Sequence, residues 1–392
     1  MAWELKKVED QRRMLVESYL KGEATMTELS GRYSVSRKTA YKWVQRYESL
    51  GVEGLKDQPR APHNPSIVFR EEDIRVAMDL KLRYWKRGPK KILEMLRRQY
   101  PKKPWPSPTR LYEIFKKNNL ISPKRMKRRV PATHPLGEVN ESNDSWSMDF
   151  KGRVLTGNGQ SWEPLTITDN FSRYLIRCAY LERKTVEQVW EILEEAFKEN
   201  GLPLRIRTDN GPPFGSTGVG RLTRLSIKLI KVGITPEWIN AGHPEENGRH
   251  ERFHQTLESE IASPPAQTLE EQIIRAMHFI AEYNFDRPHE GLNMRSPGEV
   301  YQPSSRQWDG KFRSPEYDTQ VMTVRKVGQN GCVWYRQAEY YLGTVLTGEY
   351  VGFKEEDQGI AISYGPVHLG RITEEKGFER PKAKPKKVVR RR

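Results

Sequence analysis

The chain has 392 residues, 36% of them hydrophobic and 30% charged, with a formal net charge of +16. This length predicts two or more globular domains. Cysteine occurs only at Cys178 and Cys332, which argues against a disulfide framework and a cysteine-based zinc site. Because no segment has the roughly 18 apolar residues that cross a bilayer, and no signal-peptide core is found, we expect a cytoplasmic protein without a membrane partner.

The positive charge is concentrated in one part of the chain. Residues 81–129 contain 18 Lys or Arg and two Glu, so this segment alone equals the net charge of the whole protein. Clustering on this scale indicates a polyanion partner, and nucleic acid fits better than a membrane surface or a solvated face. We therefore expect a nucleoid-associated protein.

Residues 1–57 have the signals of short helices. A first helix over 8–22 ends at a glycine, and Thr25 with Glu28 forms a capping box for the second. After a tight turn, Ser36 caps a third helix rich in Arg, Lys and Thr. This pattern predicts a helix-turn-helix DNA-binding domain, with a structural helical pair as the alternative. The recognition helix would present Arg37, Lys38 and Lys42.

A proline-rich linker over 58–69 precedes a second helical unit over 70–123. Helices are predicted over 71–85 and 90–100, and a third begins after Ser107, with proline at its first position. The third helix carries Arg110 and is another recognition-helix candidate, so the unit is helix-turn-helix or winged-helix-like. A basic linker over 124–141 follows, and its cations suit contact with phosphates. These cations are Lys124, Arg125, Lys127, Arg128 and Arg129.

From residue 142 to 305 the pattern alternates between strands and helices, which predicts a mixed α/β sheet. Strands are expected over 145–152, 160–170, 173–182 and 202–211. Helices are expected over 185–201, 220–232, 245–262 and 268–284, and the first of these has apolar residues at helical spacing.

Residues 306–375 contain six strand-like runs with glycine-rich turns, and a small antiparallel barrel-like domain or sandwich is expected there. The tail over 376–392 has nine basic residues against one Glu and is expected to be disordered. The predicted fold class is therefore multidomain: all-α helix-turn-helix units, an α/β core and a small β-barrel-like domain.

Three acidic residues interrupt elements that would otherwise be buried or apolar. Asp149 lies in the strand WSMDF, Asp209 follows the strand RIRT, and Glu251 lies within a helix. Asp209 precedes Asn-Gly, so a plain turn residue is the alternative; Asp169 is interpreted as a turn residue between strands. Carboxylates that converge from separate elements bind hard cations such as Mg²⁺, and a pair of ions supports phosphoryl transfer.

Four segments resemble a known family. WSMDF, TDNGPPF, HPEENGRHERFHQTL and YNFDRPHEGLNMRSPGEVY are similar to segments of insertion-sequence transposases with the retroviral-integrase-type DDE core. The resemblance covers about residues 140–305. It implies a ribonuclease-H-like fold and a polynucleotidyl transferase that uses two Mg²⁺ or Mn²⁺ ions. It also implies DNA cleavage and strand transfer without a covalent protein–DNA intermediate.

By position, the resemblance assigns the catalytic and metal-binding triad to Asp149, Asp209 and Glu251. Glu245 is the competitor for the third place, because it leaves 35 residues after Asp209, the commonest spacing in the family, whereas Glu251 leaves 41. The register of the Pro, Asn-Gly and Glu-Arg-Phe positions selects Glu251. Glu245 would then be a helix-start acid that interacts with the helix dipole.

The expected partners are double-stranded DNA, as transposon ends and as target, and further copies of the chain, since joining two ends requires at least a homodimer. A helper protein is not predicted from the sequence. Arg249 and Arg252 are candidates for phosphate contact, with a solvated helix face as the alternative, and Arg287 and His289 are expected to be structural. The function expected is a transposase that binds terminal inverted repeats. The alternatives are a DNA-binding regulator with an inactive core and a nuclease without strand transfer.

Overall fold

The computed structural model describes residues 8–57, 70–121, 138–240, 244–374 and 377–381. The chain divides into two compact units, residues 1–68 and 69–392. The predicted linker over 58–69, the basic residues 124–129 and the tail beyond residue 381 lie outside the described residues. No helix in the described part of the chain combines the length and the apolar content that a bilayer crossing requires.

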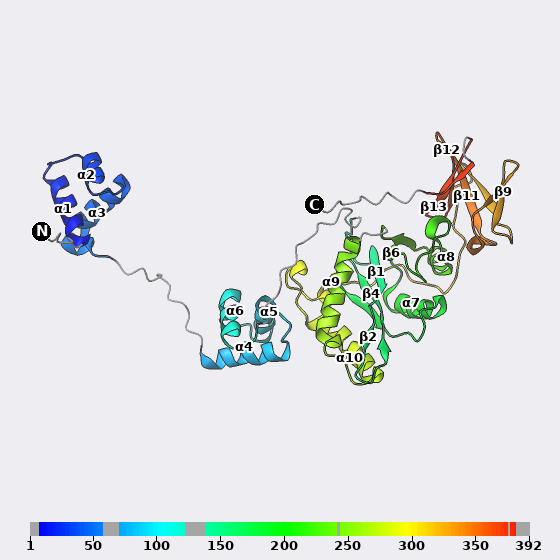
Figure 1. Ribbon diagram of the computed structural model, residues 1–392, viewed down its shortest axis with the longest axis horizontal. Coiled ribbons are helices and arrows are strands. Elements are labelled where there is room, and N and C mark those ends of the chain that lie inside the picture. The colour runs from blue at the N-terminus through cyan, green and yellow to red at the C-terminus, as the bar shows by residue number, and fades with distance from the viewer. Residues whose placement is uncertain (1–7, 58–69, 122–137, 241–243, 375–376, 382–392) are drawn as a thin grey trace. The chain divides into compact units, whose positions relative to one another are not determined.

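The first unit contains three α-helices and a short helical turn (Figure 1). They are α1 (Val8–Leu20), α2 (Met26–Arg32), α3 (Arg37–Leu50) and η1 (Gly51–Leu55). The predicted caps are present, since Thr25 and Glu28 form the capping box and the Ser36 hydroxyl accepts the Thr39 N–H. Leu15, Leu29 and Val44 are buried between the helices, which confirms the predicted helical arrangement.

The second unit begins with α4 (Glu71–Arg83), α5 (Pro89–Gln99) and α6 (Pro108–Lys117). Ser107 caps α6 as predicted, by accepting the Arg110 N–H. Ile92, Leu96 and Phe115 are buried where the three helices meet. Residues 70–121 are all described and contain no strand, so no wing is present in this part of the chain, and the helix-turn-helix assignment of this unit stays a prediction.

A five-stranded sheet forms the centre of the second unit, in the order β5-β4-β1-β6-β7 (Figure 1). Strand β1 pairs antiparallel with β4 and parallel with β6, and β7 pairs parallel with β6. The strands are β1 (Ser145–Phe150), β4 (Leu165–Asp169), β5 (Leu175–Ala179), β6 (Arg205–Thr208) and β7 (Thr235–Trp238), and a small hairpin adds β2 (Val154–Leu155) and β3 (Ser161–Trp162).

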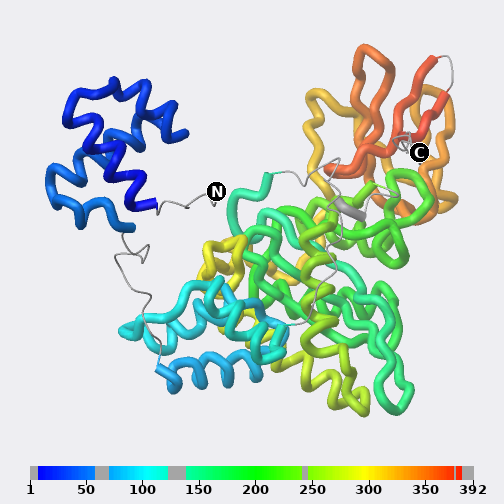
Figure 2. Tube along the Cα trace, turned by 60° about the vertical axis from the view of Figure 1, so that its left-hand side comes forward, coloured from blue at the N-terminus to red at the C-terminus, as the bar shows by residue number. Residues whose placement is uncertain are grey.

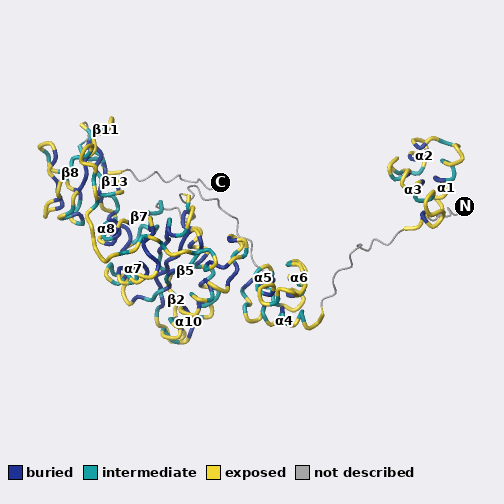
Figure 3. The backbone as a smooth tube through the Cα atoms, turned by 180° about the vertical axis from the view of Figure 1, so that it is seen from behind, coloured by how far each residue is buried: buried dark blue, intermediate teal, exposed yellow. Residues whose placement is uncertain are grey.

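Helices cover both faces of this sheet, and buried residues gather along it (Figure 3). One face packs on α7 (Val186–Asn200) and α8 (Arg224–Lys231), and the other packs on α9 (Gly248–Leu257) and α10 (Leu269–Ala281). The short helical turns are η2 (Val219–Arg221), η3 (Pro244–Asn247), η4 (Glu258–Ala262), η5 (Glu282–Asp286), η6 (Glu290–Leu292) and η7 (Pro297–Glu299).

The alternation of side chains explains the two faces, since neighbours along a strand point in opposite directions. Trp146 and Met148 pack with α7 and α8, whereas Asp149 and its partner Thr166 lie on the other face. Strand β7 is absent from the sequence prediction. It is short, contains Pro236 and lies at the sheet edge, where proline is tolerated, so its sequence lacks the usual strand signal.

The C-terminal part is all-β, as predicted. Its strands are β8 (Met322–Lys326), β9 (Cys332–Tyr335), β10 (Ala338–Tyr341), β11 (Tyr350–Glu356), β12 (Gly359–Tyr364), β13 (Val367–Thr373) and β14 (Gly377–Glu379), with a turn η8 (Thr344–Leu346). Five strands form an antiparallel sheet ordered β14-β13-β12-β11-β8, and β9 pairs with β10. A barrel is not confirmed by this pairing.

Strand β14 corrects the prediction for the start of the tail. Residues 377–379 pair with β13, and Phe378 packs against the apolar residues of this domain. The Phe378 ring docks this segment although most of its neighbours in the tail are cations. The average composition of the tail therefore gave no signal for the strand.

The segment that contains α4, α5 and α6 lies beside the core (Figure 2). Polar contacts join the α4–α5 turn and α5 to the segment that follows α10. Arg87 is 1% exposed, and its guanidinium pairs with the Glu282 carboxylate and donates to the Asp286 carbonyl oxygen at 3.3 Å. Arg98 pairs with Glu299 at 3.1 Å. The buried Arg87 is therefore the principal charged connection between the helical segment and the sheet-containing part.

The Arg87 connection predicts a stability difference between two glutamates. Glu282→Ala leaves the buried Arg87 charge without its carboxylate, and we expect it to lower the free energy of unfolding by about 3 kcal/mol. Glu290→Ala removes the partner of exposed Lys90, 3.6 Å away, and should cost less than about 0.5 kcal/mol. Urea denaturation measures the free energy of unfolding of both variants. Equal losses would contradict the role of Arg87 as the principal charged connection.

Candidate active site

Asp149 lies near the end of β1, the central strand. It is half-buried, and its carbonyl oxygen accepts a hydrogen bond from the Thr166 hydroxyl at 2.9 Å. Burial, together with the negative charges of Asp209 and Glu251, raises the pKa of Asp149 to about 7. Asp209 and Glu251 therefore lie close enough to Asp149 for their charges to act on it.

Asp209 directly follows β6, the parallel neighbour of β1. Its Oδ1 accepts the Gly211 N–H at 3.1 Å, and a Cβ at Gly211 would lie 3.2 Å from Oδ2. The Asn210 amide donates to the Ile239 carbonyl oxygen at 2.7 Å. The Asp-Asn-Gly sequence therefore ends the strand, folds the chain around the carboxylate and ties the turn to the end of β7.

Glu251 lies in the first turn of α9 and is exposed. The residues on the opposite side of this helix are buried, among them His250, Phe253 and Leu257. Phe253 and Leu257 pack against β5 residues and α10. Docking by these side chains leaves Glu251 at the rim of the site, where its charge acts on Asp149.

Two histidines connect α9 to the strand that pairs with Asp149. The Thr166 hydroxyl lies 2.8 Å from Nε2 of His250 and 2.8 Å from Nε2 of His254, and the Thr168 hydroxyl lies 2.9 Å from Nδ1 of His250. Because Thr166 uses its single proton for the Asp149 carbonyl oxygen, both Nε2 atoms must donate to it. His250 Nδ1 then accepts from Thr168, so this cluster fixes the tautomer of His250.

Both histidines are held in the neutral form. Burial, with the nearby His254, lowers the pKa of His250 well below its ordinary value. Burial and the charge of Lys151 lower the pKa of His254 to about 4. One ligand atom each of Asp149, His250 and His254 lie within 4.8 Å of one another. Since both nitrogens of His250 already bond to threonines, His250 supports the strand and is poorly placed to hold an ion.

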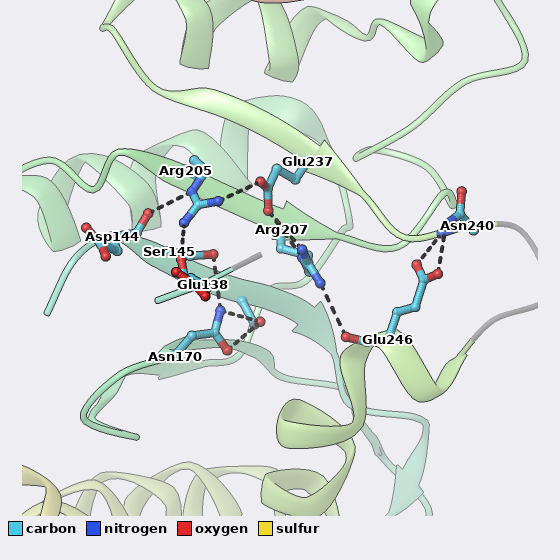
Figure 4. A network of polar contacts seen from close by, with 10 residues as sticks. Glu138, Asp144, Ser145, Asn170, Arg205, Arg207, Glu237, Asn240 and Glu246 are labelled. Atoms are coloured by element: carbon cyan, nitrogen blue, oxygen red, sulfur yellow. Dashed lines mark hydrogen bonds and ion pairs between the residues drawn. The ribbon is translucent and has the colours of Figure 1, made fainter. Parts of the chain in front are cut away.

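A second polar network joins β6 and β7 to the start of α9 (Figure 4). Glu237 on β7 pairs with Arg205 and Arg207 on β6, at 3.2 Å in each case. Arg207 also donates to the Glu246 carbonyl oxygen at 3.4 Å. The Glu246 carboxylate accepts the backbone and side-chain N–H groups of Asn240 at 2.8 and 2.7 Å. These bonds hold the start of α9 against the sheet and thereby restrain the position of Glu251.

Comparison with known proteins agrees with this arrangement. Residues 139–244 and 232–297 match two models described as integrase core domains, and residues 11–63 match a helix-turn-helix domain. The chain is 28% identical over 196 residues to the 31.7 kDa protein of insertion element IS407 from Burkholderia multivorans, covering 48% of this chain and 67% of that protein. It is 24% identical over 294 residues to the 39.2 kDa protein of insertion element IS476 from Xanthomonas euvesicatoria, covering 72% and 80%.

The chain contains an integrase core domain and is similar to proteins of insertion elements. Among solved structures, the HTLV-2 integrase catalytic core domain in complex with magnesium is similar, with a TM-score of 0.32 and 17% identity, over 41% of this chain and 98% of that chain. Integrase-core proteins depend on divalent metal ions and form a polynucleotidyl transferase family, and the helix-turn-helix and core domains imply DNA binding.

Two other acids of this integrase-core protein have structural partners. Asp169 is buried and accepts hydrogen bonds from the Asn143 N–H at 2.9 Å and from the Ser172 N–H at 2.7 Å, as expected for a turn residue. Burial raises the pKa of Asp169. Glu246 is buried, and its carboxylate accepts a hydrogen bond from the Asn240 side-chain amide. The side chain of Glu245, the competitor of Glu251, lies outside the described structure.

The proposed DNA-contacting residues have different surroundings. Arg37, Lys38 and Lys42 are exposed on α3, and Arg252 is exposed on α9. Arg110 pairs with Glu113 at 2.9 Å within α6. Arg249 is exposed but donates to the Asn170 carbonyl oxygen at 2.9 Å, so it is at least partly structural.

Arg287 and His289 have the structural surroundings that the sequence favoured. Arg287 is 7% exposed and pairs with the Glu260 carboxylate. The His289 ring packs edge-on against Tyr283, with ring centres 4.9 Å apart. Burial and neighbouring cations lower the pKa of His289 to about 2.

Sequence reasoning missed the threonine–histidine cluster and the Arg207–Glu237 network. A signal for the first exists: Thr166 and Thr168 alternate with buried apolar residues, and His250 and His254 are one helical turn apart. The second depends on pairing β6 with β7, and β7 was not predicted.

The raised pKa of Asp149 predicts how stability depends on pH. The folded chain holds the Asp149 proton more tightly than the unfolded chain, so this group's contribution to stability is lost as pH rises from about 4 to 7. We expect Asp149→Asn to raise the melting temperature of the metal-free protein by roughly 2–4 °C at pH 8. The difference should shrink toward pH 4, and Mg²⁺ should stabilise the parent more than the variant.

Calorimetry or dye-monitored melting tests this prediction. A variant that melts below its parent at pH 8 without metal would show that the Asp149 charge is not repelled in the folded protein.

The histidine cluster predicts that Thr166→Val lowers the stability of the protein. Valine has the same shape but leaves two buried imidazole N–H groups without their acceptor, which should cost about 1–3 kcal/mol. Thr235→Val on the edge strand β7 is the matched control and should change stability by less than about 0.5 kcal/mol. Urea denaturation compares them, and two equal values would remove the structural role assigned to Thr166.

Proposed function

We propose that the chain is a DNA transposase that binds the terminal inverted repeats of a mobile element and catalyses metal-dependent DNA cleavage and strand transfer. The observation that carries this proposal is the pKa of Asp149, raised by burial and by the charges of Asp209 and Glu251, within an integrase core. Three carboxylates from two strands and a helix form a donor set suited to hard divalent cations.

The chemistry of this donor set fits Mg²⁺ or Mn²⁺. Burial and the two neighbouring carboxylates make ionisation of Asp149 unfavourable. A divalent cation would offset the repulsion between these negative charges. Asp149, Asp209 and Glu251 would hold two ions. When bound, such ions activate an attacking oxygen and stabilise the leaving oxygen of a phosphodiester.

Each carboxylate is held in place by a different part of the fold. Asp149 is fixed by the central strand, and Asp209 is fixed by the Gly211 N–H and the adjoining turn. Glu251 depends on the docking of α9 through His250 and Phe253. The two aspartates would therefore form the rigid part of the site, and the glutamate would complete it from an exposed helix.

DNA recognition would involve both helical units. Arg37, Lys38 and Lys42 on exposed positions of α3 would contact a major groove, and Arg110, Arg252 and the basic residues 124–129 would contact phosphates. Joining two element ends requires two active sites near one another, so a homodimer or larger assembly on DNA is part of the proposal.

Substitution of the triad tests the chemistry separately from DNA binding. Asp149→Asn, Asp209→Asn and Glu251→Gln should each lower cleavage and joining of end DNA by at least about a thousandfold, while end binding measured in Ca²⁺ stays within about twofold. Glu246→Gln is not a suitable control because it is buried, so Glu258→Gln, on an exposed residue of η4, serves instead.

Two outcomes would change the proposal. If Glu245→Gln is inactive and Glu251→Gln is active, the third ligand is Glu245. A strand-transfer assay with pre-cleaved ends and Mn²⁺ that gives no joined product would favour a nuclease, and full activity of the Asp149 variant would refute the site.

A further inference from the structure

A cavity of about 320 Å³ lies between the α4–α5 turn and α10, and none of Asp149, Asp209 and Glu251 lines it. The end of α4 contributes Arg83, the turn contributes Trp85, Lys86 and Arg87, and α10 contributes Arg275 and Phe279. A volume of this size is at the lower end of what small-molecule sites enclose and is comparable to a single nucleotide.

The turn that forms one wall is rigidly held. Lys81 is 4% exposed, and its ammonium donates to the carbonyl oxygens of Trp85 and of Arg87, the latter at 2.9 Å. Arg87 packs its guanidinium under the Tyr84 ring, 4.1 Å from the ring centre. Because these buried cations hold the backbone, Trp85 and Lys86 project from a fixed base and not from a free loop.

The cavity has an excess of positive charge. Its two carboxylates are already paired, Glu282 with Arg87 and Glu260 with Arg287. Within the described part of the chain, Arg83, Lys86 and Arg275 have no carboxylate at ion-pair distance. The Nε–H of Arg87 is buried and has no hydrogen-bond acceptor among the described residues. A buried arginine donor without an acceptor, beside three cations, favours an anionic ligand.

The cavity also offers an aromatic surface. Trp85 is 53% exposed, unusually high for so large an apolar side chain next to a closed core. The Lys86 ammonium lies 3.8 Å from its ring centre, so the ring already stacks with a cation. Aromatic rings beside cations bind unpaired bases, since the ring stacks on the base while the cations contact the phosphate.

We propose that this cavity binds one unpaired nucleotide of a DNA strand, with its base on Trp85 and its phosphate between Arg87 and Arg275. The inference rests on the proposed function, because it takes DNA as the ligand. A base within a duplex is stacked on both sides and cannot enter a cavity of this kind, so the nucleotide must be at an overhang, a frayed end or a nick. The occupied cavity would join the second helical unit to the core.

The test measures binding by the full-length chain in Ca²⁺, with a blunt duplex and with the same duplex carrying a dT overhang. Trp85→Ala and Arg275→Ala should each weaken binding of the overhang duplex about tenfold, the size of one lost base stack, and leave the blunt duplex unchanged. Trp334→Ala, at a 63% exposed tryptophan of β9, and Lys198→Ala, at an exposed lysine of α7, are matched controls that should change neither.

A second measurement locates the nucleotide directly. An overhang that contains 5-iododeoxyuridine should photo-crosslink to the peptide that includes Trp85. Equal weakening of blunt and overhang duplexes by Trp85→Ala, no weakening at all, or a crosslink elsewhere would overturn the inference. Asp209→Asn should bind the overhang as tightly as the parent. If the parent binds the overhang through Trp85 but does not cut or join DNA in Mn²⁺, the proposed function fails and this site remains.

Discussion

The unfavourable ionisation of Asp149, caused by burial and by the negative charges of Asp209 and Glu251, is the constraint on which the proposed site depends. The pKa of Asp149 at about 7 reflects a position where burial and two like charges oppose ionisation. A chain free to relax would separate these groups. The sheet, the Asp-Asn-Gly turn and the docked helix α9 hold them within electrostatic range, and in the proposed site a divalent cation would offset this repulsion.

The supports of this arrangement are polar, although the surrounding core is apolar. Thr166 connects the Asp149 backbone to His250 and His254, and Glu237 connects β6 and β7 to the start of α9 through Arg207. Burial keeps the histidines neutral, so they add no charge beside the carboxylates. Hydrogen bonds of this kind have defined directions, which suits a site whose members come from elements far apart in sequence.

Much of the fold was predictable because local signals were strong. Ser36, Thr25 and Ser107 begin helices as their positions indicate, and the central strands alternate as expected. Strand β7 was missed because Pro236 weakens its signal, and β14 because Phe378 lies in a basic tail. The motifs pointed to Asp149, Asp209 and Glu251, but no local pattern revealed that His250 would bond to Thr166 and Thr168, since that contact depends on how α9 docks on the sheet.

Crystals of the full-length chain with end DNA and Mn²⁺, measured at a wavelength where manganese scatters anomalously, test the central claim most directly. The account predicts two manganese peaks that share the Asp149 carboxylate, with Asp209 on one side and Glu251 on the other. A peak held by Asp149, His250 and His254 without Glu251, or no peak at Asp149, would contradict it.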